Sequence, residues 1–182
     1  MHLQLLLLLL VFLAGGSIVW STLRLGISPM PTGRCVRATL LALAPEVEGE
    51  LHELGAGWGT LAWALAERFP RARVIAWEAS PVPYLFCWLR LWAQPRANLT
   101  LRFGDFLTGD LRSAALVTAY LWTGGMRALA TKLDAELEPG AWVLTHTFAW
   151  PGRTADRTAR AADLYRTPVY LYRAGAHPPP LK

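Results

Sequence analysis

The chain has 182 residues, which suits one domain of ordinary size, and a formal net charge of +5. Its basic residues are scattered rather than clustered, and only Lys132 and Lys182 are lysines, so the charge does not favour a nucleic-acid partner. The two cysteines, Cys35 and Cys87, lack metal-type spacing, so we expect free thiols in a reducing compartment and no metal site.

The chain begins with an uncharged apolar run over residues 3–20. Eighteen residues at ~1.5 Å each span about 27 Å, close to the ~30 Å hydrocarbon core of a bilayer. A cleaved signal peptide is the alternative, but no Lys or Arg precedes the run, and it continues past the small residues 14–17. We therefore expect a retained transmembrane anchor over residues 1–23.

Three arginines follow the anchor before the first acid of the chain: Arg24, Arg34 and Arg37. The positive-inside tendency then places the domain in the cytoplasm. The prediction is a single-pass protein of the inner (cytoplasmic) membrane, with the bilayer itself as one partner.

Residues 24–46 are expected to form a proline-containing linker and a helix, Arg34–Ala44. An α/β domain is expected over 47–175 and a frayed tail over 176–182. Within the domain, strand-like and helix-like patterns alternate: Glu50–Leu54, Leu61–Phe69, Arg73–Glu78, Val82–Ala93, Leu99–Phe103, Ala115–Leu121, Gly125–Glu138 and Ala141–Phe148. This alternation predicts a doubly wound, mainly parallel sheet, and two later runs, Thr158–Leu164 and Pro168–Arg173, predict an antiparallel hairpin.

The most informative motif is a glycine turn, Gly55, Gly57 and Gly59, between the first strand and its helix. Glycine lets the backbone approach a ligand closely, because no Cβ stands in the way. Nineteen residues after Gly59 the second strand ends in Glu78, whose carboxylate can accept both hydroxyls of a ribose at the same edge of the sheet. An ordinary turn is the alternative, but the acid in register favours a nucleoside-containing cofactor.

The glycine spacing indicates which cofactor binds. Dinucleotide sites use G-x-G-x-x-G, whereas this chain has G-x-G-x-G with Thr60 next, and no P-loop lysine follows. The pattern resembles motif I of the class I S-adenosylmethionine-dependent methyltransferases. An NAD-dependent oxidoreductase is the alternative, and a binding screen that compares S-adenosylmethionine with NAD would decide between the two.

Two further strand ends carry candidate site residues. Asp105 follows the third strand, where its carboxylate can accept the adenine amine while the N–H of Phe106 bonds a ring nitrogen. The alternative role of Asp105 is a cap. Tyr120 ends the fourth strand, where an aromatic ring can hold a methyl acceptor in line and face a sulfonium, or can simply pack. His52 and His146 are expected to be packed histidines.

Several segments together resemble one small methyltransferase family: ELGAGWGTLAWALAERFP, VIAWEASPVPYLF, NLTLRFGDF and AYLWTGGMRAL. It comprises bacterial relatives of the mitochondrial membrane-anchored lysine methyltransferases that act on the ATP synthase c subunit and the adenine nucleotide translocator. The resemblance implies a seven-stranded Rossmann-like fold and a lysine or other amine of a membrane protein as acceptor. It also implies that Glu53, Gly55, Gly57 and Gly59 flank the methionine part of the cofactor, with Glu78 on the ribose and Asp105 on the adenine.

The sequence therefore predicts a membrane-anchored methyltransferase that needs no dedicated general base. A small-molecule or lipid methyltransferase and a non-catalytic cofactor-binding membrane module remain the alternatives.

The helix Val82–Ala93 is apolar nearly all round, with Tyr84, Trp88 and Trp92 in one stripe. These aromatic residues either pack against the sheet or meet the membrane interface.

Overall fold

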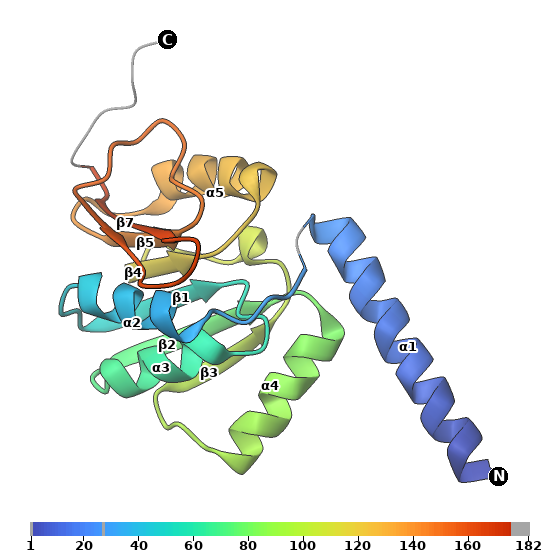
Figure 1. Ribbon diagram of the computed structural model, residues 1–182. Helices are drawn as coiled ribbons and strands as arrows, with labels where there is room; N and C mark the ends of the chain where they lie inside the picture. Colours follow the sequence, from blue (N-terminus) through green and yellow to red (C-terminus); the bar gives the residue numbers. More distant parts are fainter. Residues whose placement is uncertain (1, 27, 176–182) are drawn as a thin grey trace.

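The protein folds around one seven-stranded sheet, described by a computed structural model for residues 2–26 and 28–175 (Figure 1). The sheet order is β3-β2-β1-β4-β5-β7-β6. The strands are β1 (Gly49–Leu54), β2 (Ala72–Glu78), β3 (Leu99–Phe103), β4 (Ala114–Ala119), β5 (Trp142–His146), β6 (Arg157–Arg160) and β7 (Pro168–Arg173). The helices are α1 (His2–Leu25), α2 (Arg34–Leu43), α3 (Thr60–Arg68), α4 (Pro81–Ala93), the short 3₁₀ helix η1 (Phe106–Thr108) and α5 (Thr123–Glu136).

The strand directions confirm the predicted α/β fold class. Strands β1 to β5 are mutually parallel, whereas β7 runs antiparallel to β5, and β6 antiparallel to β7. The chain leaves β1 for β2 on one side and later returns to β4 on the other. Because β1 and β4 are neighbours, the topological switch point lies at their carboxyl ends, where ligands bind in open α/β sheets.

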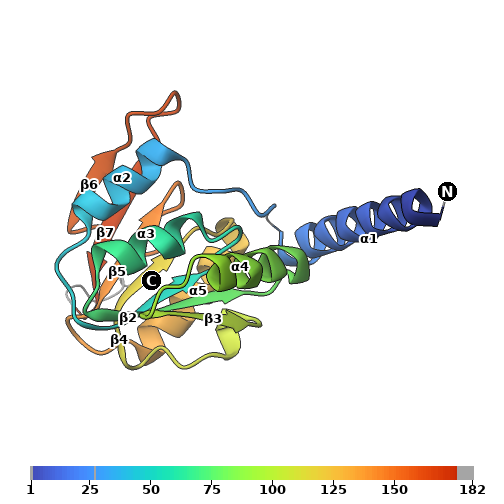
Figure 2. The same ribbon diagram turned by 90° about the horizontal axis from the view of Figure 1, so that it is seen from below.

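Helices cover both faces of the sheet, and alternate residues of each strand supply the two cores. Leu116 and Leu144 face a core shared with α2, α3 and α4. Their chain neighbours Val117 and Val143 face a second core, shared with α5. Figure 2 shows α2, α3 and α4 together on one side of the sheet. This two-sided burial explains why the central strands read as nearly continuous apolar runs.

Two predicted features of the tail differ in outcome. The hairpin is confirmed, but β6 ends at Arg160 rather than at Leu164. The chain turns there because the Asp163 carboxylate accepts the Thr167 N–H at 2.8 Å and the Thr167 hydroxyl at 2.6 Å. The predicted frayed tail, 176–182, lies outside the described residues.

Helix α1 projects away from the sheet (Figures 1 and 2). It is 24 residues long and apolar enough to cross a membrane, and its most apolar stretch is not buried against the described part of the domain. Its last turns lie beside α4, so the end of α1 contacts the domain close to the carboxyl edge of the sheet.

Candidate active site

A cavity of about 290 Å³ lies at the carboxyl edge of the sheet. The ends of β1, β2, β3 and β4 all contribute to its wall, so it sits at the topological switch point. Six of the residues predicted for the site line it: Gly55, Gly57, Glu78, Asp105, Phe106 and Tyr120. Glu53 and Gly59 lie outside this lining.

The three glycines of the turn all have left-handed backbone conformations, with φ of 83° at Gly55, 55° at Gly57 and 71° at Gly59. A Cβ on Gly57 would meet no atom within 4 Å, so this glycine leaves open space beside the cavity. A Cβ on Gly59 would lie 2.7 Å from the ring of Trp63 and 2.9 Å from Cys87 Sγ. Gly57 therefore leaves space open beside the cavity, whereas the absence of a side chain at Gly59 allows α3 to pack against α4.

Glu78 joins the glycine turn to the end of β2. Its buried carboxylate accepts the Gly57 N–H through Oε2 at 2.6 Å and the Ser80 N–H through Oε1 at 2.7 Å. Each carboxylate oxygen has a second lone pair, so two backbone bonds leave acceptor capacity toward the cavity. The residue predicted to bind a ribose also fixes the loop that forms the cavity floor.

Glu53 is the other buried acid next to this turn. Its Oε2 atom has no hydrogen-bond partner among the described residues. Burial, and then the nearby Glu78, raise the pKa of Glu53 well above its usual range. A positive charge placed beside this carboxyl group would lower its pKa again, because it would offset both effects.

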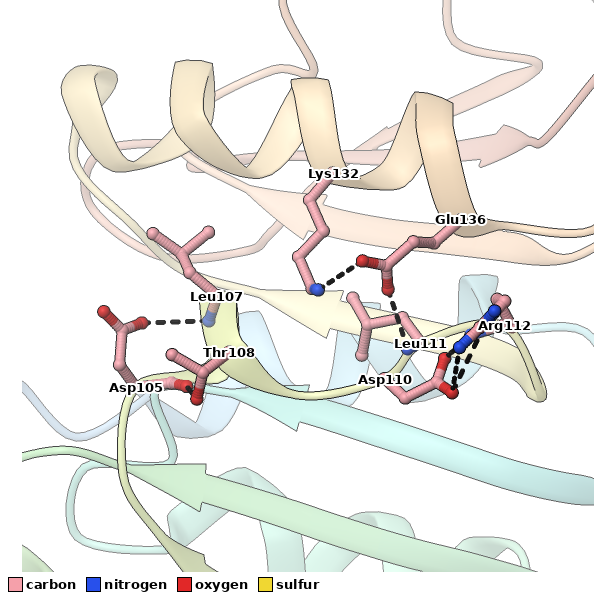
Figure 3. Close-up of polar contacts among 8 residues, drawn as sticks. All are labelled: Asp105, Leu107, Thr108, Asp110, Leu111, Arg112, Lys132 and Glu136. Atoms are coloured by element: carbon pink, nitrogen blue, oxygen red, sulfur yellow. Dashed lines mark hydrogen bonds and ion pairs between the residues drawn. The ribbon is translucent and has the colours of Figure 1, made fainter.

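The Asp105 turn is held in place by polar contacts on both sides (Figure 3). Asp105 Oδ1 accepts the Leu107 N–H at 2.9 Å and so caps η1, which was the alternative role expected for this residue. Farther along, Glu136 of α5 accepts the Leu111 N–H at 3.0 Å and pairs with Lys132 at 2.5 Å. The loop that carries Asp105 and Phe106 is thus fastened to α5.

An aromatic stack lies where β4 and β5 end. The ring of Tyr120 lies over that of His146, with centroids 4.3 Å apart and planes 16° apart. His146 is buried, and this burial lowers its pKa to about 4, so the ring is neutral at physiological pH. The sequence predicted a packed His146, but gave no sign that it packs under Tyr120.

The roof of the cavity comes from the end of α1 and from the segment between α1 and α2, neither of which the sequence analysis placed near the site. Arg24, Leu25 and residues 28–30 all line the cavity. The indole N–H of Trp58 donates to the Pro29 carbonyl at 2.6 Å, and the Thr32 N–H donates to Thr60 Oγ1 at 3.0 Å. The prolines of this linker indicated stiffness, but only the three-dimensional contacts reveal where it lies.

Gly26 fits closely against the same wall. With its φ of 72°, a Cβ there would fall 2.5 Å from the ring of Trp122. Trp122 follows Tyr120 at the carboxyl end of β4 and also lines the cavity.

Across residues 2–26 and 28–175, no group of three or more His, Cys, Asp or Glu side chains is arranged to hold a metal ion.

Comparison with known proteins identifies relatives over most of the chain. Residues 53–157 match the family described as the ANTKMT methyltransferase domain. A protein-lysine N-methyltransferase of Saccharolobus islandicus (strain REY15A) is 36% identical over 76 residues, which make up 41% of this chain and 47% of that protein. This chain therefore matches about half the length of that curated relative.

Solved structures share the fold. An RNA methyltransferase from Salinibacter ruber, in complex with S-adenosyl-L-homocysteine, superimposes with a TM-score of 0.73 at 28% identity, covering 84% of this chain and 98% of that one. A putative methyltransferase from Escherichia coli has a TM-score of 0.63 at 18% identity, covering 81% and 89% of the two chains, and supports the fold alone.

The different surroundings of the turn glycines predict different costs of adding a methyl group. Gly57→Ala should lower the free energy of unfolding by about 1–2 kcal/mol, the cost of a left-handed L-residue. Gly59→Ala should lower it by a further ~1–3 kcal/mol, because its Cβ would also overlap Trp63 and Cys87. Urea denaturation of both variants measures the difference, and equal losses would contradict the packing role of Gly59.

Proposed function

Because the chain belongs to the ANTKMT methyltransferase family and is a class I, S-adenosylmethionine-dependent methyltransferase, we propose that it methylates a protein lysine amine beside a membrane. The observation that carries the proposal is an aromatic, uncharged acceptor wall next to a cofactor cavity whose roof comes from the end of α1. The relative named as a protein-lysine N-methyltransferase supports the same acceptor.

The residues around the cavity fit the parts of S-adenosylmethionine. Glu78 faces the cavity with free acceptor capacity for the ribose hydroxyls, and Asp105 with Phe106 would hold the adenine. Gly55, Gly57 and Gly59 would keep the turn open beside the methionine part. Glu53, buried beside the glycine turn, also supports this fit, because the ammonium group of the cofactor would favour the ionised form of a carboxyl group whose pKa is otherwise raised by burial.

The chemistry assigned to the chain is positioning rather than acid–base catalysis. S-adenosylmethionine, when bound, supplies a methyl group on a positively charged sulfur, which a neutral amine attacks in line. Tyr120 would place the acceptor amine and offer its ring face to the positive charge. The apolar wall formed by Leu121 and Trp122 favours the unprotonated amine, since a low-dielectric site lowers the pKa of a lysine.

Anchoring belongs to the same proposal. Residues 1–23 would form a single membrane span, with residues 47–175 as the methyltransferase domain on the cytoplasmic side. The length and apolarity of α1 support the span, and Arg24 at its end supports the orientation. A lipid or small-molecule acceptor shares every cofactor residue, and the similar fold of an RNA methyltransferase adds RNA as an acceptor to test.

Cofactor binding should depend on Glu78. S-adenosylhomocysteine at a hundred times its dissociation constant should stabilise the protein by about 2.7 kcal/mol and raise Tm, whereas NAD should not. Glu78→Ala should weaken binding by roughly ten- to a hundredfold, the loss of a charged hydrogen bond. Glu48→Ala, at an exposed acid far from the cavity, is the control. Calorimetry with equal affinities in the two variants would remove Glu78 from the site.

Binding should also release a proton from Glu53. Its pKa is raised in the free protein, and a bound ammonium would lower it, so the carboxyl group ionises on binding and affinity rises with pH. Calorimetry in buffers of different ionisation enthalpy should detect this proton. Glu53→Gln should abolish the buffer dependence, and an unchanged dependence in that variant would assign the proton to another group.

The acceptor should be a lysine of a membrane-associated protein. Membranes from a strain lacking the enzyme are incubated with methyl-labelled S-adenosylmethionine and the full chain, and the labelled residue is identified by mass spectrometry. Tyr120→Ala should reduce labelling by about a hundredfold through misplacement of the acceptor, whereas Tyr120→Phe keeps the ring. Label in lipid, RNA or a small molecule would refute the lysine assignment while leaving the cofactor assignment intact.

A further inference from the structure

Helix α4 presents an apolar stripe to the outside of the molecule. Its four members recur at helical spacing on one face and are exposed: Leu85 (54%), Trp88 (52%), Leu89 (50%) and Trp92 (80%). A helix flanking a sheet needs an apolar face only toward the sheet. Four large exposed apolar side chains in one contiguous stripe, two of them tryptophans, therefore mark a contact surface.

The opposite face of α4 already supplies its packing. Pro83 and Cys87 are buried against the domain, and Tyr84 is half-buried with its ring 5.0 Å from that of Phe103. Packing against the sheet, the alternative expected for the aromatic residues of this helix, accounts for Tyr84. It does not account for Trp88 and Trp92, which point away from the domain core.

The segment that carries the stripe has charges of one sign only. No acidic residue occurs between Glu78 and Asp105, a stretch that includes α4 and β3, whereas Arg90, Arg96 and Arg102 do occur. Arg90 lies over the ring of Trp63 at 4.3 Å, and Arg102 is exposed on the edge strand. An apolar stripe with arginines and no acids complements the surface of an anionic bilayer.

The position of α4 relative to α1 indicates the same partner. The two helices are in contact, and Figure 1 shows them diverging downward from the carboxyl edge of the sheet, α1 away from the domain and α4 along it. Trp20 and Leu23 on α1 are exposed as well, at 68% and 78%. Both helices that meet at this contact therefore expose large apolar side chains.

We propose that the stripe of Leu85, Trp88, Leu89 and Trp92 lies in the headgroup–acyl boundary of the bilayer that α1 spans. This inference rests on the anchor of the proposed function. Tryptophan favours that boundary, where its ring is in an apolar setting and its N–H meets water. The domain would then contact the membrane at two places, the span and α4, rather than through the span alone.

The second contact fixes the orientation of the site. Phe86 of α4 meets the ring of Trp58 edge-on, with centroids 5.3 Å apart, and Trp58 in turn holds the Pro29 carbonyl of the cavity roof. A membrane-bound α4 would therefore hold the roof of the cavity at a set height above the lipid.

The test places one spin label at a time in the full chain. The starting variant carries Cys35→Ser, because Cys35 is exposed; Cys87 is retained, since it is buried and its pKa is raised to about 12. Labels are attached at Trp88→Cys, Trp92→Cys and, within the proposed span, Leu10→Cys. The matched control is Leu164→Cys, an apolar position that is 90% exposed on the β6–β7 turn, at the opposite edge of the sheet.

Each variant is placed in lipid nanodiscs containing phosphatidylglycerol, at one copy per disc, and collisions with oxygen and with a water-soluble nickel chelate are measured. Labels at 88 and 92 should lose collisions with the chelate and gain them with oxygen, whereas the label at 164 should stay open to the chelate. Labels at 88 and 92 as open as the one at 164 would overturn the proposal.

The outcomes separate this inference from the function on which it rests. A protected label at 10 with open labels at 88 and 92 keeps the anchor and refutes the second contact. An open label at 10 refutes the anchor. Protection at 88 and 92 that arises only with several copies per disc would identify a second chain as the partner and overturn the lipid assignment. Trp88→Ser with Trp92→Ser should leave affinity for S-adenosylhomocysteine unchanged, which confirms that the domain remains folded.

Discussion

The cavity depends on one buried carboxylate. Glu78 accepts the N–H of Gly57 from one strand–helix turn and the N–H of Ser80 from the next, so one side chain links the turns that follow β1 and β2. Charge-assisted bonds of this kind are about twice as strong as neutral ones. The Gly55 and Ala56 N–H groups of the same turn donate to the Trp77 carbonyl at 3.0 and 2.7 Å. The backbone and the last side chain of β2 therefore hold the glycine turn together, and Glu78 is the part of this contact that also lines the cavity.

Two glutamates in adjacent strands have opposite surroundings. The oxygens of Glu78 accept bonds from backbone donors, whereas Glu53 is buried, has a raised pKa, and has one oxygen with no hydrogen-bond partner in the part of the chain that the structure describes. Environment rather than residue type assigns their roles, as it does for carboxylate pairs in many active sites. Glu78 fixes the loop, whereas the pKa of Glu53 would fall when a positive charge binds beside it.

The sequence alone was sufficient to predict the sheet and many of the residues that line the cavity. Alternating apolar patterns predicted the order of strands and helices, and parallel strands bring their carboxyl ends to one edge, which is why Gly57, Glu78 and Asp105 could be grouped in advance. The cap formed by Asp105 could also be predicted, because it involves only neighbouring residues. The roof could not be predicted, because the hydrogen bond from Trp58 to Pro29 joins residues that are 29 positions apart and share no sequence pattern. The stacking of Tyr120 on His146 also depends on the pairing of β4 with β5, which periodicity does not reveal in detail.

The roof gives α1 a second significance. Arg24 and Leu25 belong both to the long apolar helix and to the cavity lining. If α1 spans the bilayer as proposed, one helix would reach from the lipid to the place where the cofactor would sit, and a tilt of that helix would move a wall of the cavity. Bilayer thickness and curvature would then influence the shape of the site, and a domain without residues 1–25 would lack part of the cavity lining.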